Sequence, residues 1–160
     1  MHFRVLCVII FEQVLTTAVY APRNFIMKQT IQALCTAARE ATNNAYAPYS
    51  GYRVGAALLC ADGTIYTGCN VENASYSVTC CAERVAIYKA ISEGKKDFTA
   101  IAIAARKQEQ WVGFIPCGVC RQTFVEFCTQ DMHIYVCKGE QAEEIEEYTL
   151  GQLFPSGFSL

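Results

Sequence analysis

The sequence predicts an α/β fold of three layers, with helices on both faces of a central mixed sheet. Apolar residues recur at helical spacing in some segments and form short continuous runs in others, which indicates helices and buried strands. The expected order is helix, two strands, helix, strand, helix and strand, and such alternation favours a sheet that is covered on both faces. Neither a repeat nor a Gly/Ser/Pro-rich linker divides the 160 residues, a length that suits one domain.

The first half of the chain predicts a helix and a β-hairpin. Residues 25–45 carry the helix, which we expect to end near Asn43-Asn44. Its apolar positions at helical spacing are Ile31, Leu34, Cys35 and Ala38. After a loop, two short apolar strands at 54–60 and 64–69 flank a turn at Asp62-Gly63.

The second half predicts two helices that alternate with two strands. One helix opens at Cys80-Cys81 and is closed by Gly94, and a buried strand follows at 99–105. Pro116 marks the start of the next helix. The remaining elements are a strand at residues 132–137 and a short helix with an aromatic end within 148–160. An acidic stretch before that tail is expected to be a solvated face: Glu143, Glu144, Glu146 and Glu147.

The first 24 residues allow two interpretations. A weakly basic start, an apolar run at residues 5–11 and small residues at Ala18 and Ala21 fit a signal peptide. Glu12 interrupts that run early, and the run falls far short of the ~20 apolar residues that span a bilayer. We favour an N-terminal extension of uncertain role at 1–24, followed by a single domain at 25–160, with no membrane partner.

Composition limits the partners of this domain. The chain is 52% hydrophobic and 18% charged, which suggests that partner subunits cover some apolar surface. Its net charge is -2 and it has no Lys/Arg run, so the basic stripe of a nucleic-acid-binding protein is missing. The ten cysteines do not suit a disulfide-dense small fold, since Cys35, Cys60 and Cys137 lie inside apolar patterns. We therefore expect a reduced, cytoplasmic protein.

Two short cysteine clusters carry the chemistry. Cys81-Ala82-Glu83 supplies one thiol and a carboxylate, and Cys117 with Cys120 forms a Cys-x-x-Cys pair at metal-ligand spacing. Three thiolates leave one position of a tetrahedral zinc ion free for water, as in catalytic rather than structural zinc sites. Cys80 has the wrong offset to the glutamate and is expected to pack. The clusters predict one hydrolytic Zn²⁺ per subunit.

Two neighbouring charges complete the predicted site. Glu83 is the expected proton shuttle between water, a ring nitrogen and the leaving amine, although a glutamate at a helix start can serve the helix dipole alone. Arg84 is expected to hydrogen-bond the ligand sulfurs and, together with the two helix N-termini, to offset the negative charge of the thiolates. The alternative interpretation is an arginine on the exposed surface of a helix.

Four segments together resemble the small, homotetrameric cytidine deaminases, over roughly Met27 to the C-terminus. The Cys-Ala-Glu and Pro-Cys-x-x-Cys pattern is the zinc-deaminase signature that general accounts of the class give, here with cysteine in place of the usual histidine. The matching segments are YSGYRVGAAL (49–58), GCNVENASY (68–76), CAER (81–84) and PCGVCRQ (116–122).

The resemblance implies a cytidine deaminase-like fold and the hydrolysis of cytidine and deoxycytidine to uridine and deoxyuridine, a reaction of pyrimidine salvage that releases ammonia. It implies that Asn70 and Glu72 hold the ribose hydroxyls, which an amide and a carboxylate can do. Tyr52, where the family usually has phenylalanine, would stack near the pyrimidine, and Ala82 would be a further substrate-binding residue. It also implies a homotetramer that shares its sites, in which Tyr76 reaches a neighbouring subunit and Phe158 closes over the base.

Three alternatives remain open from the sequence. The first is a structural zinc module for protein interactions, which would need a fourth protein ligand. The second is a polynucleotide-editing deaminase, which the near-neutral composition does not favour. The third is a deaminase of another aminonucleoside, against which only Asn70, Glu72 and the neutral setting argue.

Overall fold

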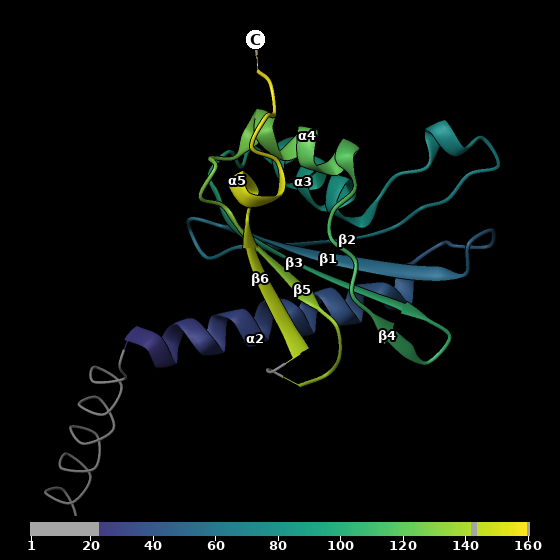
Figure 1. Ribbon diagram of the computed structural model, residues 1–160, viewed down its shortest axis with the longest axis horizontal. Helices are drawn as coiled ribbons and strands as arrows, with labels where there is room; N and C mark the ends of the chain where they lie inside the picture. Colours follow the sequence, from purple (N-terminus) through teal and green to yellow (C-terminus); the bar gives the residue numbers. More distant parts are fainter. Residues whose placement is uncertain (1–22, 142–143, 160) are drawn as a thin grey trace, which may run out of the picture. The chain divides into compact units, whose positions relative to one another are not determined.

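The computed structural model describes residues 23–141 and 144–159 (Figure 1). Residues 31–160 form one compact unit, and within residues 1–30 the described part, from Arg23 onward, is helical. The expected extension at 1–24 therefore lies, apart from its last two residues, outside the described residues. None of the helices in the described ranges combines the length and apolar character that a membrane crossing requires.

The elements follow the expected order, with two additional strands. The helices are α2 (Arg23–Ala41), α3 (Ala82–Ser92), α4 (Gly118–Phe127) and α5 (Leu150–Leu153). The strands are β1 (Tyr52–Cys60), β2 (Ile65–Cys69), β3 (Phe98–Lys107), β4 (Gln110–Val112), β5 (His133–Cys137) and β6 (Ile145–Thr149). Two 3₁₀ turns are η1 (Thr42–Asn44) and η2 (Tyr76–Val78).

The strands form one mixed sheet, as predicted. Its order is β2-β1-β3-β5-β6, and β4 pairs with β3 off this path. Among the strands of the described residues β3 and β5 pair in parallel, joined through β4 and α4, whereas the other strand pairs are antiparallel. The expected hairpin is β1–β2, with Gly55 opposite Cys69 and Leu59 opposite Ile65.

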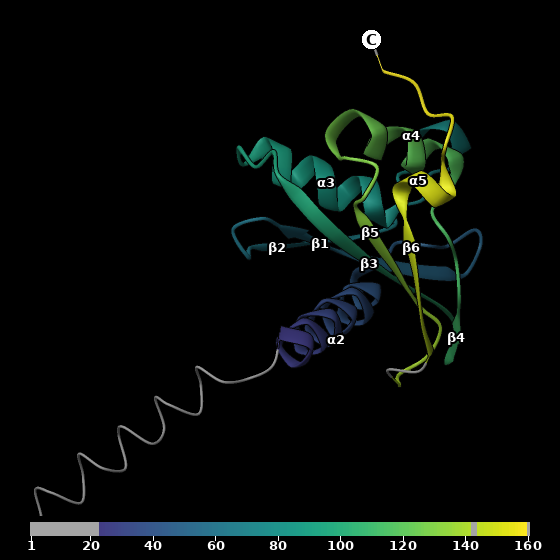
Figure 2. The ribbon, with the colours of Figure 1, turned by 60° about the vertical axis from the view of Figure 1, so that its left-hand side comes forward.

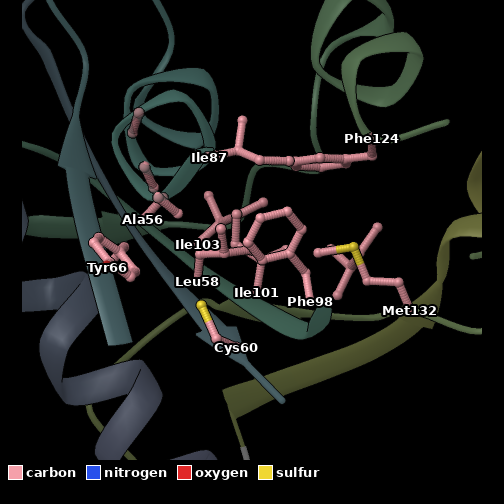
Figure 3. Packing of buried hydrophobic residues seen from close by; sticks show 14 of the residues in the cluster. Ala56, Leu58, Cys60, Tyr66, Ile87, Phe98, Ile101, Ile103, Phe124 and Met132 are labelled. Carbon is pink, nitrogen blue, oxygen red and sulfur yellow. The ribbon is translucent and has the colours of Figure 1, made fainter. Parts of the chain in front are cut away.

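Helices cover both faces of this sheet, which confirms the three-layer α/β/α prediction. Helices α3, α4 and α5 lie on one face, and residues 31–41 of α2 lie on the other (Figure 2). On the first face Leu58, Ile101 and Ile103 of the sheet pack against Ile87 of α3 and Phe124 of α4 (Figure 3). These side chains are at most 2% exposed, and burying each stabilises the fold by about 1.5–3 kcal/mol.

The second face is built from small residues that allow a close approach of α2. Leu34, Cys35 and Ala38 of the helix pack on strand alanines and on Tyr135 and Cys137. The expectation that Cys35, Cys60 and Cys137 are apolar core residues is confirmed, since each is at most 3% exposed.

Two strands were not predicted, and one of them, β6, lies within the stretch expected to be a solvated face, of which Glu143 is outside the described residues. Ile145–Thr149 is not merely a solvated face but the edge strand β6, paired antiparallel with β5. Its glutamates do keep exposed carboxylates, and they pair across the strands: Glu146 with Lys138, and Glu147 with His133. The short strand β4 continues from a turn at Gln108, which has a φ of 52°.

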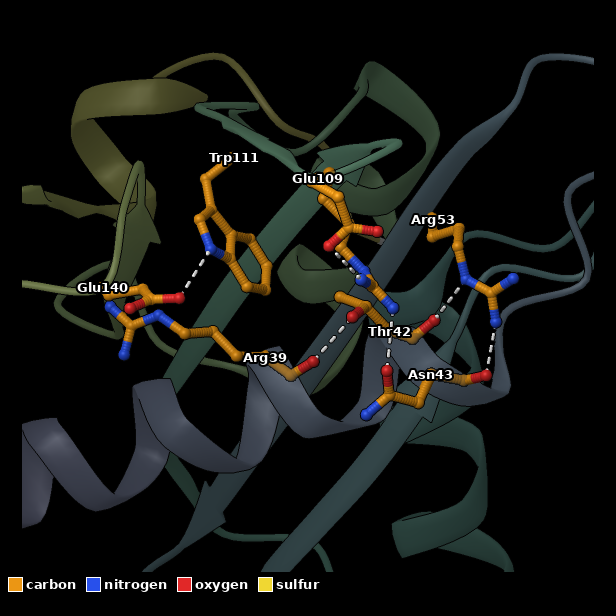
Figure 4. A network of polar contacts seen from close by, with 8 residues as sticks. Arg39, Thr42, Asn43, Arg53, Glu109, Trp111 and Glu140 are labelled. Carbon is orange, nitrogen blue, oxygen red and sulfur yellow. Dashed lines mark hydrogen bonds and ion pairs between the residues drawn. The ribbon is translucent and has the colours of Figure 1, made fainter.

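The helix α2 ends earlier than the expected Asn43-Asn44, at Ala41, and η1 continues to Asn44. Arginines from two strands hold this turn (Figure 4). Arg53 of β1 donates Nε–H to the Thr42 carbonyl at 3.0 Å, and Arg106 of β3 donates to Asn43 Oδ1 at 2.8 Å. The turn that leads toward β1 is thereby fastened to the interior strands β1 and β3.

Gly68 of β2 determines how closely α3 approaches the sheet. A Cβ atom at this position would lie 2.4 Å from the Ala82 carbonyl oxygen and 2.5 Å from the Ala86 nitrogen. Only a residue without a side chain permits this approach. The first turn of α3, which carries Glu83, therefore lies directly on β2.

Candidate metal centre and cleft

Three cysteine sulfurs meet between the starts of α3 and α4. The Sγ atoms of Cys81, Cys117 and Cys120 all lie within 4.8 Å of one another. Cys81 and Cys117 are 3.9 Å apart, and Cys117 and Cys120 are 3.6 Å apart. Zinc–sulfur bonds of about 2.3 Å at tetrahedral angles put sulfurs about 3.8 Å apart, so this cluster fits one zinc ion. No further His, Cys, Asp or Glu atom of the described residues joins the group.

Local structure explains why these sulfurs meet. Cys81 is the N-cap residue of α3 and Cys117 is the N-cap residue of α4, each in extended conformation. Cys120 follows in the first turn of α4, where an i, i+3 pair faces the same side. Helix N-termini carry positive partial charge and unpaired N–H donors, so both helices favour thiolate over thiol.

The electrostatics of the cluster support metal binding by thiolate. Hydrogen bonding from the Cys120 thiol, with further help from Arg84 and Cys117, lowers the pKa of Cys81 to about 5 against the opposing effect of burial. This shift favours the thiolate form of Cys81, whereas the same hydrogen bond raises the pKa of Cys120. Zinc requires deprotonated sulfur.

Arg84 lies beside the cysteine cluster, as the sequence analysis predicted. Its Nη2 donates to the Thr79 carbonyl at 2.7 Å and lies 4.0 Å from Cys81 Sγ, at the long limit for a contact to sulfur. Its Nε is buried and has no hydrogen-bond partner among the described residues. The guanidinium thus brings positive charge to the sulfurs and is anchored through the backbone of Thr79.

Glu83 lies in the first turn of α3, next to the thiols. It is buried, with 5% of its surface exposed to solvent. Burial, followed by the nearby charge of Cys81, raises the pKa of Glu83 to about 7. A carboxyl group with a pKa near neutrality can both accept and donate a proton at physiological pH.

A cleft of about 300 Å³ opens above the cluster and brings together most of the predicted site residues. Its lining includes the predicted residues Tyr52, Asn70, Glu72, Cys81, Ala82, Glu83 and Cys117. The cleft also has members that the sequence analysis missed: Ser50, Val54, Thr79, Ile103, Phe114 and Ile115. The volume and mixed apolar and polar lining suit a small organic ligand.

Asn70 faces this cleft and also holds the first strand in place. Its Oδ1 accepts from the Val54 N–H at 2.8 Å, and its Nδ2 donates to the Tyr52 carbonyl at 2.9 Å. An amide has two donors and two acceptor positions, so one of each is left for a ligand. Asn70 is 7% exposed and lines the cleft.

Glu72 is held by the loop that leads into β1. Its carboxylate accepts from the backbone of Tyr49 and from the backbone and hydroxyl of Ser50. Burial alone would raise the pKa of Glu72. The hydrogen bonds from Ser50 and Tyr49 outweigh that effect and lower the pKa below its usual range. The side chain is therefore an anionic acceptor in the cleft.

Aromatic rings form one wall of the cleft. The Tyr52 ring meets the Phe114 ring edge-on, with centroids 5.1 Å apart, and Lys107 Nζ lies 4.5 Å from the Tyr52 centroid. Tyr52 and Lys107 are direct cross-strand partners of β1 and β3. Phe114 comes from the segment after β4, whose position the sequence analysis did not anticipate.

Two expected substrate-binding residues lie away from the cleft in the single chain. Tyr76 of η2 is 73% exposed, with its ring 6.2 Å from that of Tyr49. Phe158 is 67% exposed, its carbonyl accepts from Gln122, and it lines a different groove beside α4. Neither residue lines the cleft.

Comparisons with known proteins agree with this geometry. Residues 28–136 match the family model described as "Cytidine and deoxycytidylate deaminase zinc-binding region". A cytidine deaminase of Sporosarcina psychrophila is 46% identical over 131 residues, 81% of this chain and 91% of the relative. One of Halalkalibacterium halodurans is 44% identical over 137 residues, 86% of this chain and 94% of the relative.

A solved structure gives the same result at the level of the fold. The crystal structure of cytidine deaminase from Burkholderia pseudomallei superposes with a TM-score of 0.71 at 39% identity, covering 79% of this chain and 97% of that one. The matched region contains the whole cysteine cluster, which lies between Cys81 and Cys120. With its three-cysteine zinc site and its mixed α/β sheet, this chain belongs to the cytidine deaminase family of zinc-binding hydrolases.

Proposed function

We propose that this protein hydrolyses cytidine and deoxycytidine to uridine and deoxyuridine and releases ammonia, as a step of pyrimidine salvage. One observation carries the proposal: the buried Glu83, two thiols of the cluster (Cys81 and Cys117) and the polar pair Asn70 and Glu72 line the same cleft. A proton shuttle, a metal site and a sugar-binding pair are the parts that such a reaction needs. The curated relatives named above are themselves cytidine deaminases.

The thiols of Cys81, Cys117 and Cys120 would hold one zinc ion per subunit, as their spacing fits. When bound there, zinc lowers the pKa of a water molecule and makes it a nucleophile at neutral pH. Glu83 would take the first proton of the attacking water on a carboxylate oxygen and pass it to the ring nitrogen. It would then take the second proton, from the hydroxyl group formed at the attacked carbon, and give it to the amine, which leaves as ammonia. Arg84 and the N-termini of α3 and α4 offset the negative charge of the sulfurs.

The rest of the cleft orients the nucleoside. Asn70 and Glu72 together offer a donor and acceptors to the sugar hydroxyls. Tyr52 and Phe114 provide an aromatic surface for the pyrimidine ring. The backbone N–H of Ala82, the first residue of α3, has no acceptor within its helix and is free for a carbonyl oxygen of the base.

Tyr76 and Phe158 could contact the substrate only in an assembly of several subunits. Both are exposed in the single chain, as are Val78 and Val119, which are 64% and 60% exposed. Exposed apolar residues in such number favour burial against other subunits. We propose a homotetramer with shared sites, in which Tyr76 and Phe158 of one subunit complete the cleft of another.

The proposal includes two statements about the whole chain. We assign residues 25–160 to the catalytic domain and residues 1–24 to an extension. We also place the protein in the cytoplasm, which the nine free cysteines among the described residues support.

A substrate panel tests the proposed function. Purified protein with measured zinc content is assayed with cytidine, deoxycytidine, cytosine and dCMP, with and without a chelator. We expect turnover of the two nucleosides that chelation abolishes and added zinc restores. Stoichiometric zinc without turnover of either nucleoside would refute the proposal, and preference for a different aminonucleoside would replace its substrate.

A further inference from the structure

The carboxylate of Glu72 is fixed from three directions by two adjacent loop residues. Its Oε2 accepts from the backbone N–H of Tyr49 at 2.9 Å and from that of Ser50 at 3.2 Å. Its Oε1 accepts from the Ser50 hydroxyl at 2.5 Å. Glu72 is 9% exposed, and Ser50 lines the cleft beside it.

The Ser50 hydroxyl has a second bond that links Glu72 to the sheet. Its Oγ accepts from the backbone N–H of Tyr52, the first residue of β1, at 3.0 Å. One hydroxyl therefore joins the carboxylate of Glu72 to the residue that begins the aromatic wall of the cleft. The loop is also tied to the Glu72 segment by its backbone, since Glu72 N–H donates to the Tyr46 carbonyl at 2.8 Å.

Counting acceptor positions shows what this arrangement leaves for a ligand. An ionised carboxylate has about four acceptor positions and no donor. Two are used on Oε2 and one on Oε1, so one position on Oε1 remains. The group that binds there must be a hydrogen-bond donor, and a phosphate or other anion would be repelled by the carboxylate.

We propose that Ser50 is a positioning residue that orients Glu72 to accept one hydrogen bond from one sugar hydroxyl. This inference rests on the proposed function and deepens it. The substrate class is a pyrimidine nucleoside whose hydroxyl facing Glu72 is free, and nucleosides phosphorylated at that hydroxyl are excluded. Ser50 acts through Glu72 and does not itself touch the reacting atoms.

Removal of the hydroxyl has a specific consequence. In Ser50→Ala the two backbone N–H groups still hold Oε2, but Oε1 loses its fixed direction. Hydrogen bonds to charged groups are worth enough that the loss of this orientation should weaken sugar binding on the order of tenfold. A ligand that lacks the 2′- and 3′-hydroxyls should bind equally well to both proteins, because it offers Glu72 no hydroxyl on the ribose ring itself.

The test measures dissociation constants on the zinc-loaded protein by calorimetry, with uridine and 2′,3′-dideoxyuridine as ligands that do not turn over. For Ser50→Ala we expect uridine to bind about tenfold more weakly and dideoxyuridine to bind within about twofold of wild type. We expect kcat for cytidine to stay within about twofold while KM rises. Ser50→Thr, which keeps the hydroxyl, should restore uridine affinity.

Two controls make the result specific. Ser92→Ala removes a hydroxyl that donates to the Lys89 carbonyl at the end of α3, away from the cleft, and it should change neither dissociation constant. In a Glu72→Gln background, Ser50→Ala should cost far less than tenfold, because the two residues act as one unit. Equal weakening of both ligands, or no weakening of either, would overturn the proposal. If the wild-type protein does not turn over cytidine, that result contradicts the proposed function and leaves the role of Ser50 to the binding measurements.

Discussion

Cys81 and Cys117 occupy the same position in two different helices, since each is the N-cap residue of its helix, and their Sγ atoms lie 3.9 Å apart. Two helix N-termini are thus directed at one cluster of sulfurs. This arrangement places partial positive charge where thiolates must form, and it lets Cys120 join from the next turn of α4.

The first prediction concerns the ligand set. Cys117→Ala should lose stoichiometric zinc, because two thiolates hold the ion less well than three. Metal analysis of the purified protein checks this. Cys80→Ala is the matched control: Cys80 neighbours Cys81 but is outside the cluster, so that variant should keep its zinc. Zinc loss in both variants, or in neither, would contradict the assignment.

The second prediction concerns Arg84. Arg84→Gln removes the positive charge near Cys81 Sγ, so the zinc affinity should fall by about tenfold or more, within the range known for groups that support metal ligands. Competition with a chromophoric chelator measures the affinity. Arg84→Lys, which keeps the charge, should lose less than Arg84→Gln. Unchanged affinity and activity in Arg84→Gln would remove the charge-compensation argument.

The third prediction concerns the approach of α3 to the sheet. Gly68→Ala places a methyl group within 2.5 Å of the backbone of α3, so the helix must shift, at a cost of about 1–3 kcal/mol in the free energy of unfolding. Denaturant unfolding measures this cost. Gly118→Ala is the control, since a Cβ there meets nothing within 4 Å, and it should change stability by less than about 0.5 kcal/mol. Equal stability of Gly68→Ala and wild type would show that α3 does not depend on this contact.

The zinc centre was predictable from the sequence because its geometry is local. A Cys-x-x-Cys pair at a helix start lies within one turn, and Cys81-Ala82-Glu83 likewise lies at one helix start. Four of the strands and the three longer helices were also predictable, because each has a regular apolar pattern.

The walls of the cleft were not predictable in the same way. Ser50, Phe114 and Ile115 reach it through the pairing of β1 with β3 and the turn after β4, contacts that no short spacing encodes. The edge strand β6 was not predicted, for a different reason. Two consecutive glutamates interrupt its alternation, and they are tolerated because an edge strand leaves carboxylates in solvent, where Glu146 and Glu147 find cross-strand partners.

The most direct test of the account is the zinc content and turnover of Glu83→Gln. The substitution keeps the size of a buried side chain that is no zinc ligand, so zinc should remain stoichiometric. The rate of cytidine deamination should fall by at least ~10²-fold, since the amide cannot move the protons. Glu109→Gln, at a carboxylate whose side chain is 95% exposed, should match wild type in both measurements. Near-normal turnover by zinc-loaded Glu83→Gln would contradict the central claim.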